Sequence, residues 1–305
     1  MNKIIEVHGL KKSFGSLEAV KNIGFYVEEG SLFAFLGPNG AGKSTTIDML
    51  TTRLKPDGGE VILGGYRLGR DDDRIRGSIG IVFQDSLLDP LLTVKENLQV
   101  RGSFYGLPRA ALEAAIAAAA EAACVGEFLT RPYGKLSGGQ RRRADIARAL
   151  IHTPRVLFLD EPTTGLDPQT RKNVWEMILK LQREQGMTVF LTTHYMEEAA
   201  QADYITIIDH GEVLARGTPL ELKNRYAADI LKIKPVLDAE LAGVLTDLGA
   251  AFDRDAAGVY RIALSRTVEA LGIIDRCRDN VENIEIINGT MDDVFINLTG
   301  MEVRS

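Results

Sequence analysis

Cysteine is scarce in this sequence, and its scarcity excludes a disulfide-stabilised scaffold. The two cysteines, Cys124 and Cys277, lie far apart and lack the spacing of a metal site. No apolar run approaches the ~20 residues that a membrane-spanning helix needs. The first residues, MNKIIEVHGLKKSFG, lack the apolar core of a secretory signal. These absences predict a soluble protein of a reducing compartment, which is the cytoplasm.

An excess of positive charge is also missing. The chain has 36 lysines and arginines against 42 acidic residues, a net charge of −6, so no general affinity for nucleic acid is expected. A local basic patch at Arg141 to Arg143 remains, and these arginines are interpreted as a solvated helix face. The length of 305 residues suits one large domain and a smaller one.

Four short, continuous apolar runs predict strands that are buried on both faces, as in a parallel sheet covered by helices. Segment 15–30 is more typical of an antiparallel β layer. The runs are Leu32–Leu36, Ile79–Phe83, Val156–Leu159 and Thr188–Leu191, and the helices expected between them span 43–52, 108–123, 139–151 and 170–185.

A polar or flexible group follows each apolar run. The carboxyl ends of parallel strands share one edge of the sheet, and ligands of open α/β sheets bind along that edge. The layout therefore predicts that five side chains gather in one crevice: Lys43, Gln84, Asp160, Glu161 and His194.

The composition changes after about residue 225. A β-α-β-β-α-β order is expected if Ala250–Phe252 starts a strand, and a last amphipathic helical turn follows at 290–300. This region has no catalytic motif. We therefore predict a small regulatory or docking domain at 225–305, after a larger domain at 1–224. The other expected strands are 228–234, 258–264 and 282–288, and the helices lie near 237–248 and 267–278.

The stretch GPNGAGKST at 37–45 matches the phosphate-binding loop G-x-x-x-x-G-K-[ST]. Glycines let backbone amides approach phosphate oxygens, and the helix that follows adds positive partial charge. Lys43 would supply charge to the β and γ phosphates, and the Ser44 hydroxyl would bind Mg²⁺. A chance Gly-rich turn is the alternative, but this motif follows a buried strand and precedes a helix. The motif therefore predicts nucleotide binding.

Two adjacent carboxylates follow the run at 156–159. Asp160 is placed as a magnesium ligand beside the phosphate-binding loop. Glu161 is placed to orient a water molecule, or to accept its proton, for attack on the γ-phosphate. The alternative is a helix-capping pair before Pro162. With Lys43 present, we favour catalysis.

Three further residues have weaker signals. His194 is expected at the same edge, in contact with the γ-phosphate, although a lone histidine is more often structural. Gln84 could reach the magnesium shell or the attacking water, and otherwise it is a surface amide. Phe14 could stack on adenine, and otherwise it is a core residue.

The stretch KLSGGQRRR at 135–143 is a second Gly-rich turn. Ser137 can cap the helix that follows, and Gly138 and Gly139 expose further amides. It is an anion site in principle, and otherwise simply the start of a helix.

Together these stretches resemble the ATP-binding cassette (ABC) ATPases over about residues 3–222. Walker A is GPNGAGKST, the Q-loop IVFQD, the signature LSGGQ, Walker B VLFLDEP, the D-loop TGLDP, and the switch histidine sits in LTTHYMEEA. The segment at 89–108, the run RRRADIARALIHTPRVLFLDEPTTGLDP and the ending TMDDVFINLTG resemble the daunorubicin-resistance type of exporter. The resemblance implies a P-loop NTPase fold with an antiparallel β subdomain, a helical subdomain and a small α+β C-terminal domain.

The resemblance also implies that two such chains pair head to tail as a homodimer. Ser137 to Gly139 of one chain would then contact the γ-phosphate held by the other, and Asp167 would communicate across the interface. ATP and Mg²⁺ are the implied ligands. The implied catalytic residues are Glu161, His194, Gln84 and Lys43, the metal ligands are Ser44, Gln84 and Asp160, and the nucleotide-binding residues are Phe14, Gly37, Pro38, Asn39, Gly40, Ala41, Gly42, Lys43, Ser44, Thr45, Ser137, Gly138, Gly139, Gln140 and Asp167.

The implied function is the ATP-hydrolysing subunit of an exporter. It would act through separate integral membrane permease subunits and lie peripherally on the inner face of the membrane, with no nucleic-acid partner. The helical subdomain and the groove beside Gln84 would receive a coupling helix of the permease. A soluble ABC ATPase that acts on a macromolecular complex is the alternative, and a non-hydrolysing docking module is a third idea.

Overall fold

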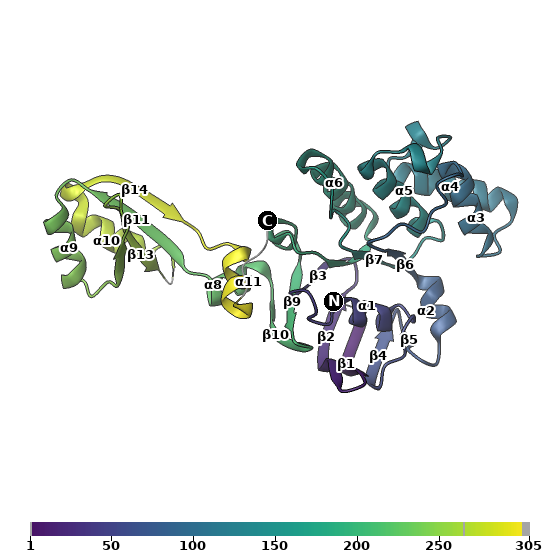
Figure 1. Ribbon diagram of the computed structural model, residues 1–305, viewed down its shortest axis with the longest axis horizontal. Helices are drawn as coiled ribbons and strands as arrows, with labels where there is room; N and C mark the ends of the chain where they lie inside the picture. Colours follow the sequence, from purple (N-terminus) through teal and green to yellow (C-terminus); the bar gives the residue numbers. More distant parts are fainter. Residues whose placement is uncertain (1, 265, 301–305) are drawn as a thin grey trace. The chain divides into compact units, whose positions relative to one another are not determined.

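The computed structural model describes residues 2–264 and 266–300, which form two compact units, Met1–Arg216 and Gly217–Ser305 (Figure 1). Each unit has a β-sheet core of its own. Within the described residues, no helix is both long and apolar enough to cross a membrane.

The N-terminal unit contains two sheets. The antiparallel sheet has the order β2-β1-β4-β5, which confirms the β layer expected at 15–30. The other sheet has the order β10-β9-β3-β8-β7-β6, and its strands from β9 to β6 are parallel. Their bounds are β1 Lys3–Phe14, β2 Leu17–Glu28, β3 Leu32–Leu36, β4 Gly58–Leu63, β5 Tyr66–Arg67, β6 Ile79–Val82, β7 Val156–Asp160, β8 Thr188–Thr192, β9 Tyr204–Asp209 and β10 Glu212–Gly217.

The parallel strands are mostly apolar because helices and the second sheet cover both of their faces. All five residues of β3 are buried. The core between the two sheets includes stacked or tilted rings of Phe25, Phe33 and Phe190, with neighbouring centroids 5.1–6.2 Å apart. The four apolar runs of the sequence are confirmed as the parallel strands β3, β6, β7 and β8.

Seven helices are described for this unit, and α3, α4 and α5 pack against one another (Figure 1). Alanine has the highest helix propensity, which accounts for α4. Both α3 and α5 start with a capping box, formed by Thr93 with Glu96 and by Ser137 with Gln140. The helices are α1 Lys43–Leu50, α2 Asp72–Ser78, α3 Val94–Ser103, α4 Arg109–Ala122, α5 Gly138–Leu150, α6 Pro168–Gln185 and α7 Met196–Ala199.

The C-terminal unit is an α+β domain. Its antiparallel sheet has the order β12-β13-β11-β14, and β12 confirms the strand expected from Ala250–Phe252. Apolar residues of β11 and β13 pack with Leu241, Leu245 and Ala270 of two helices. The elements are α8 Pro219–Tyr226, β11 Asp229–Pro235, α9 Asp238–Asp247, β12 Phe252–Arg254, β13 Tyr260–Leu264, α10 Glu269–Cys277, β14 Val281–Ile287 and α11 Met291–Thr299.

Helix α8 lies in the C-terminal unit, where Asn297 Nδ2 of α11 donates a hydrogen bond to the Tyr226 carbonyl over 2.8 Å. The boundary expected between 224 and 225 falls inside this helix.

Candidate functional site

The phosphate-binding loop connects β3 to α1, and two of its glycines allow no side chain. A Cβ on Gly37 would lie 2.3 Å from the Ile208 carbonyl oxygen. Gly42 has a φ of 103°, and its Cβ would lie 2.5 Å from the Ala19 carbonyl oxygen. Because α1 begins at Lys43, its first amides have no partner within the helix. The loop therefore offers the backbone donors that a phosphate needs.

Lys43 lies inside this loop with 8% of its surface exposed. Its Nζ donates hydrogen bonds to the carbonyls of Gly37, over 2.6 Å, and Pro38, over 3.0 Å. Burial lowers the pKa of Lys43, and the nearby carboxylates of Glu161 and Asp160 act in the opposite direction. The ammonium group is thus held between the loop and the end of β7.

The end of β7 carries both carboxylates, and β8 holds them in place. Thr192 Oγ1 donates a 2.6 Å hydrogen bond to Asp160 Oδ1. The Glu161 amide donates to the Thr192 carbonyl over 3.0 Å. Glu161 has a φ of 48°, a left-handed conformation that is rare for a residue with a side chain. Such strain often marks functional sites, where surrounding contacts maintain it.

Glu161 and His194 lie together just beyond the ends of β7 and β8. Glu161 Oε1 is 3.3 Å from His194 Nδ1, and the two side chains are 15% and 38% exposed. Thr164 Oγ1 donates to the other carboxylate oxygen, Glu161 Oε2, over 3.3 Å. The carboxylate is therefore oriented and still accessible. No helix begins at Asp160 or Glu161, so the capping alternative is wrong.

Arg142 was expected on a solvated helix face, and this expectation is wrong. The side chain is buried, with 8% exposed, and its guanidinium donates to backbone carbonyls at the ends of β6 and β7. Gln84 follows one of these carbonyls directly and is exposed. Burial lowers the pKa of Arg142.

The second Gly-rich turn starts α5. Ser137 Oγ accepts a hydrogen bond from the Gln140 amide over 3.3 Å, and Gln140 Oε1 accepts from the Ser137 amide over 3.1 Å. Ser137 and Gly138 are exposed, whereas Gly139 is buried. The Ser137 hydroxyl keeps its proton free for donation to an anion.

Asp167 is the N-cap residue of α6. Its Oδ1 accepts from the Thr170 amide over 3.0 Å, and hydrogen bonds from Thr170 lower the pKa of this carboxyl. Phe14 ends β1 with half of its surface exposed, so it is not a core residue. Lys12 Nζ lies 5.7 Å from the centroid of its ring.

Two residues in this region escaped the sequence analysis. Glu198 is 3% exposed and accepts hydrogen bonds from the hydroxyls of Thr163 and Thr193, the latter over 2.7 Å. Burial raises the pKa of Glu198. Thr192, described above, is the second. The Glu198 carboxylate, through the hydroxyls of Thr163 and Thr193, links the segment after Glu161 to the segment before His194.

The oxygen donors at the strand ends suit Mg²⁺. The Ser44 hydroxyl, the Asp160 carboxylate and the Gln84 amide oxygen are hard ligands. Across residues 2–264 and 266–300, no group of three or more His, Cys, Asp or Glu side chains could hold a metal ion by itself. Magnesium that is shared with nucleotide phosphates needs only one or two protein ligands, so the donor set fits.

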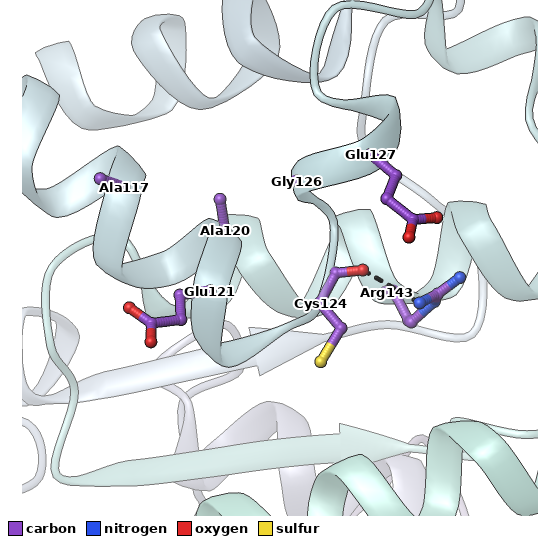
Figure 2. A pocket seen from close by; sticks show the side chains of 7 residues that line it. All are labelled: Ala117, Ala120, Glu121, Cys124, Gly126, Glu127 and Arg143. Carbon is purple, nitrogen blue, oxygen red and sulfur yellow. Dashed lines mark hydrogen bonds between the residues drawn. The ribbon is translucent and has the colours of Figure 1, made fainter.

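A pocket of about 430 Å³ lies elsewhere, among α4, α5 and the short 3₁₀ turn Gly126–Phe128 (Figure 2). Arg143 Nη1 donates to the Cys124 carbonyl over 2.9 Å in this pocket. None of the residues expected in the nucleotide site lines it; its lining is Ala117, Ala120, Glu121, Cys124, Gly126, Glu127 and Arg143.

The family model of the ABC transporter matches residues 20–164. The Nod factor export ATP-binding protein I of Ralstonia nicotianae is 38% identical over 309 residues, which cover 99% of this chain and 95% of that protein. The daunorubicin/doxorubicin resistance ATP-binding protein DrrA of Streptomyces peucetius is 38% identical over 310 residues, or 98% of this chain and 93% of that protein. The linearmycin resistance ATP-binding protein LnrL of Bacillus subtilis is 35% identical over 99% of this chain and 100% of its own.

Solved structures agree with the fold. The dimeric post-hydrolysis structure of the ATP-binding cassette MJ0796, bound to ADP and Pi, has a TM-score of 0.63 at 30% identity and covers 70% of this chain and 98% of its own. CbiO1 of Clostridium perfringens, part of the transporter complex cbiONQ, has a TM-score of 0.68 at 27% identity. The match covers 82% of this chain and 97% of CbiO1.

These findings confirm the P-loop fold, the ATPase activity and the drug-exporter type, with a separate permease. They support that function over the alternative of a soluble ATPase acting on a macromolecular complex. With relatives more than 30% identical along nearly their whole length, this chain belongs to the ABC transporter family as an ATP-hydrolysing subunit.

Proposed function

We propose that two copies of this chain enclose two ATP molecules, each held by one copy and sealed by the other. The phosphate-binding loop and Lys43 would hold the triphosphate. The turn Ser137–Gly139 of the second copy, in which Ser137 and Gly138 are exposed, would close on its γ-phosphate. Support comes from the exposure of Ser137 and Gly138 and from the position of Gly138 and Gly139 at the start of α5, where amides have no partner within the helix. A two-fold pair of identical chains would carry two equivalent sites.

Magnesium and adenine would bind at the two ends of the nucleotide. Ser44, Gln84 and Asp160 are the proposed magnesium ligands, and the ion would neutralise charge on the β and γ phosphates. Phe14 is the proposed stacking partner of adenine. Its half-exposed ring at the end of β1 supports this role.

For hydrolysis, Glu161 would orient the attacking water and accept its proton, and His194 would contact the γ-phosphate. The observation that carries this proposal is the Glu161–His194 pair, with 3.3 Å between Oε1 and Nδ1. The left-handed backbone of Glu161, fixed by the hydrogen bond from its amide to the Thr192 carbonyl, positions the side chain before the nucleotide binds. Positioning of this kind supplies much of the catalysis in phosphoryl transfer.

The permease would dock on the segment after Gln84 and on the helical subdomain. Leu87, Leu91 and Phe104 are 65%, 86% and 73% exposed there, although they are large apolar side chains. Large apolar side chains with such exposure often mark an interaction site. We propose that a cytoplasmic helix of the permease covers them, so that the subunit lies on the inner face of the membrane, without a nucleic-acid partner.

The C-terminal unit is proposed to regulate or brace the dimer, in line with the role expected for residues 225–305. Its complete sheet and separate core support an independent role. The relatives are named for Nod factor export, daunorubicin resistance and linearmycin resistance, yet they align along nearly all of this chain. We propose that the permease, and not this subunit, selects the exported compound.

The test is Glu161→Gln, assayed by phosphate release and by light scattering with MgATP. Removing the base should lower hydrolysis by about 10²-fold or more while ATP binding persists. The variant should therefore accumulate as an ATP-bound dimer. Glu197→Gln, at an exposed position of α7, is the matched control and should behave as the wild type. A Glu161→Gln chain that turns over normally, or that stays monomeric with ATP, would refute the proposed role.

A further inference from the structure

Helix α5 contacts the nucleotide-site strands through two buried, charged side chains one turn apart. Arg142 and Asp145 are 8% and 4% exposed. The helix starts with the signature turn at Ser137, so both residues follow that turn within two helical turns. Burying charged groups is costly unless hydrogen bonds satisfy them. Their partners therefore indicate what the burial achieves.

The Arg142 guanidinium is satisfied entirely by backbone oxygens at two strand ends. Nη1 donates to the Phe83 carbonyl over 2.5 Å, immediately before Gln84. Nη2 donates to the Glu161 carbonyl over 2.7 Å and to the Asp160 carbonyl over 3.2 Å. Nε donates to the Pro162 carbonyl. One side chain of α5 thus holds the residue before Gln84 and the backbone of Glu161.

Asp145 holds the other side of Gln84. Its Oδ1 accepts a 2.6 Å hydrogen bond from Ser86 Oγ, and its Oδ2 accepts from Tyr133 OH over 3.2 Å. Only Gln84 and Asp85 lie between the two anchor points, Phe83 and Ser86. Two residues between fixed ends have little freedom, so Gln84 follows the position of α5.

We propose that Arg142 and Asp145 are positioning residues that couple the two ATP sites of the dimer through α5. This inference rests on the proposed function. The N-terminal turn of α5 would seal the ATP held by the partner, while Arg142 and Asp145 fix Gln84 and Glu161 of the chain's own site. Closure of α5 on one ATP then sets the catalytic geometry at the other. Hydrolysis should therefore depend cooperatively on ATP concentration.

Arginine suits this task because its planar guanidinium has five donors in a fixed fork. Lysine presents three donors from a single nitrogen and cannot span carbonyls from two strand ends. Arg142→Lys should therefore retain the charge and lose the coupling. This distinguishes positioning from a simple need for positive charge.

The test is steady-state hydrolysis against ATP concentration for the wild-type chain, Arg142→Lys and Arg142→Gln, with ATP binding measured by calorimetry. The wild type should show a Hill coefficient above one. In both variants kcat should fall at least tenfold and the Hill coefficient should approach one, with binding affinity within about threefold. Arg143→Ala is the matched control, since this next side chain on α5 donates to the Cys124 carbonyl and lies over the Phe128 ring, and neither partner is a strand end of the nucleotide site.

Ser86→Ala is the second variant and is less prone to a folding defect, because Ser86 is exposed. The substitution removes the hydrogen bond to Asp145 and a local one from the Leu88 amide, and it leaves Arg142 intact. We expect a several-fold loss of kcat and a lower Hill coefficient. A kcat within twofold of the wild type in Arg142→Lys and Ser86→Ala, or an unchanged Hill coefficient, overturns the inference. A wild-type Hill coefficient of one also overturns it. If instead the wild-type chain fails to hydrolyse ATP, or Glu161→Gln fails to dimerise, the proposed function itself is wrong.

Discussion

Glu161 and His194 face each other at the ends of adjacent parallel strands, with 3.3 Å between Oε1 and Nδ1. The register between β7 and β8 fixes this relationship, because Asp160 pairs with Thr192 and each side chain follows within two residues. A carboxylate and an imidazole at this separation can act on the same water and phosphate.

His194→Ala should lower kcat by about 10²-fold, because it removes a group placed at the reacting phosphate. ATP affinity by calorimetry should stay within about threefold, since the phosphate-binding loop is intact. His210→Ala is the control, as His210 is highly exposed and belongs to the loop between β9 and β10. A kcat within threefold of the wild type would assign His194 a structural role.

Lys43→Ala should nearly abolish ATP binding. The buried ammonium lies among carbonyl oxygens and beside two carboxylates, so its loss leaves negative charge facing the triphosphate. Calorimetric titration of ATP should show at least a hundredfold weaker binding. Lys55→Ala, at an exposed position after α1, should bind normally. Retained tight binding by Lys43→Ala would contradict the assignment.

Glu198→Ala should destabilise the protein by about 2–4 kcal/mol, because two buried threonine hydroxyls would each lose an acceptor. Glu198→Gln keeps one acceptor oxygen and should lose less. Urea unfolding followed by circular dichroism measures both. Glu197→Ala is the control. Glu197 is the exposed residue before Glu198, and its substitution should change the free energy of unfolding by less than about 0.5 kcal/mol. Equal stability of Glu198→Ala and the wild type would show that the network is unimportant.

The free energy of unfolding should depend on pH in the alkaline range because Tyr133 is buried. Burial, together with the Asp145 carboxylate, raises the pKa of Tyr133 to about 12. Between pH 10 and 12 the folded phenol keeps its proton while the unfolded one loses it. Stability from this group is therefore complete below pH 10 and falls by up to about 1.4 kcal/mol per pH unit as pH rises.

Tyr133→Phe should lack that component. The difference in unfolding free energy between the variant and the wild type should be constant from pH 7 to 9 and then shift in favour of the variant up to pH 12. Urea unfolding at each pH measures the difference. A difference that stays constant to pH 12 would show that the phenol is not perturbed.

Much of the fold can be predicted because apolar runs report burial directly. The runs at Leu32–Leu36 and Val156–Leu159 lack alternation, and only a sheet covered on both faces explains that pattern. Polar groups at their ends then indicate a site, since the ends of parallel strands converge. The close approach of Glu161 and His194 agrees with that reasoning.

Arg142 could not be predicted in the same way. It stands among three consecutive arginines after a helix cap, which is the usual pattern of a solvated helix face. Its partners are backbone carbonyls at the ends of β6 and β7, and backbone acceptors leave no mark in a sequence. Glu198 is similar, because its hydroxyl partners come from two loops that only the folded sheet brings together.

The central claim is that each ATP site is shared between two chains. Ser137→Arg blocks the sealing turn of a chain, and Lys43→Ala disables its phosphate-binding loop, so each variant alone should be inactive. A mixed dimer should contain one working site, built from the loop of the Ser137→Arg chain and the turn of the Lys43→Ala chain.

The decisive measurement is phosphate release after mixing the two inactive variants. With random association, half of the dimers are mixed and each has one of its two sites, so an equimolar mixture should recover measurable activity, at most about a quarter of the wild-type value, because the coupled second site is disabled. Activity should be highest near equal amounts and fall towards zero at either extreme. Absence of recovery at every ratio, with both variants folded and mixed dimers present, would contradict a site shared between chains.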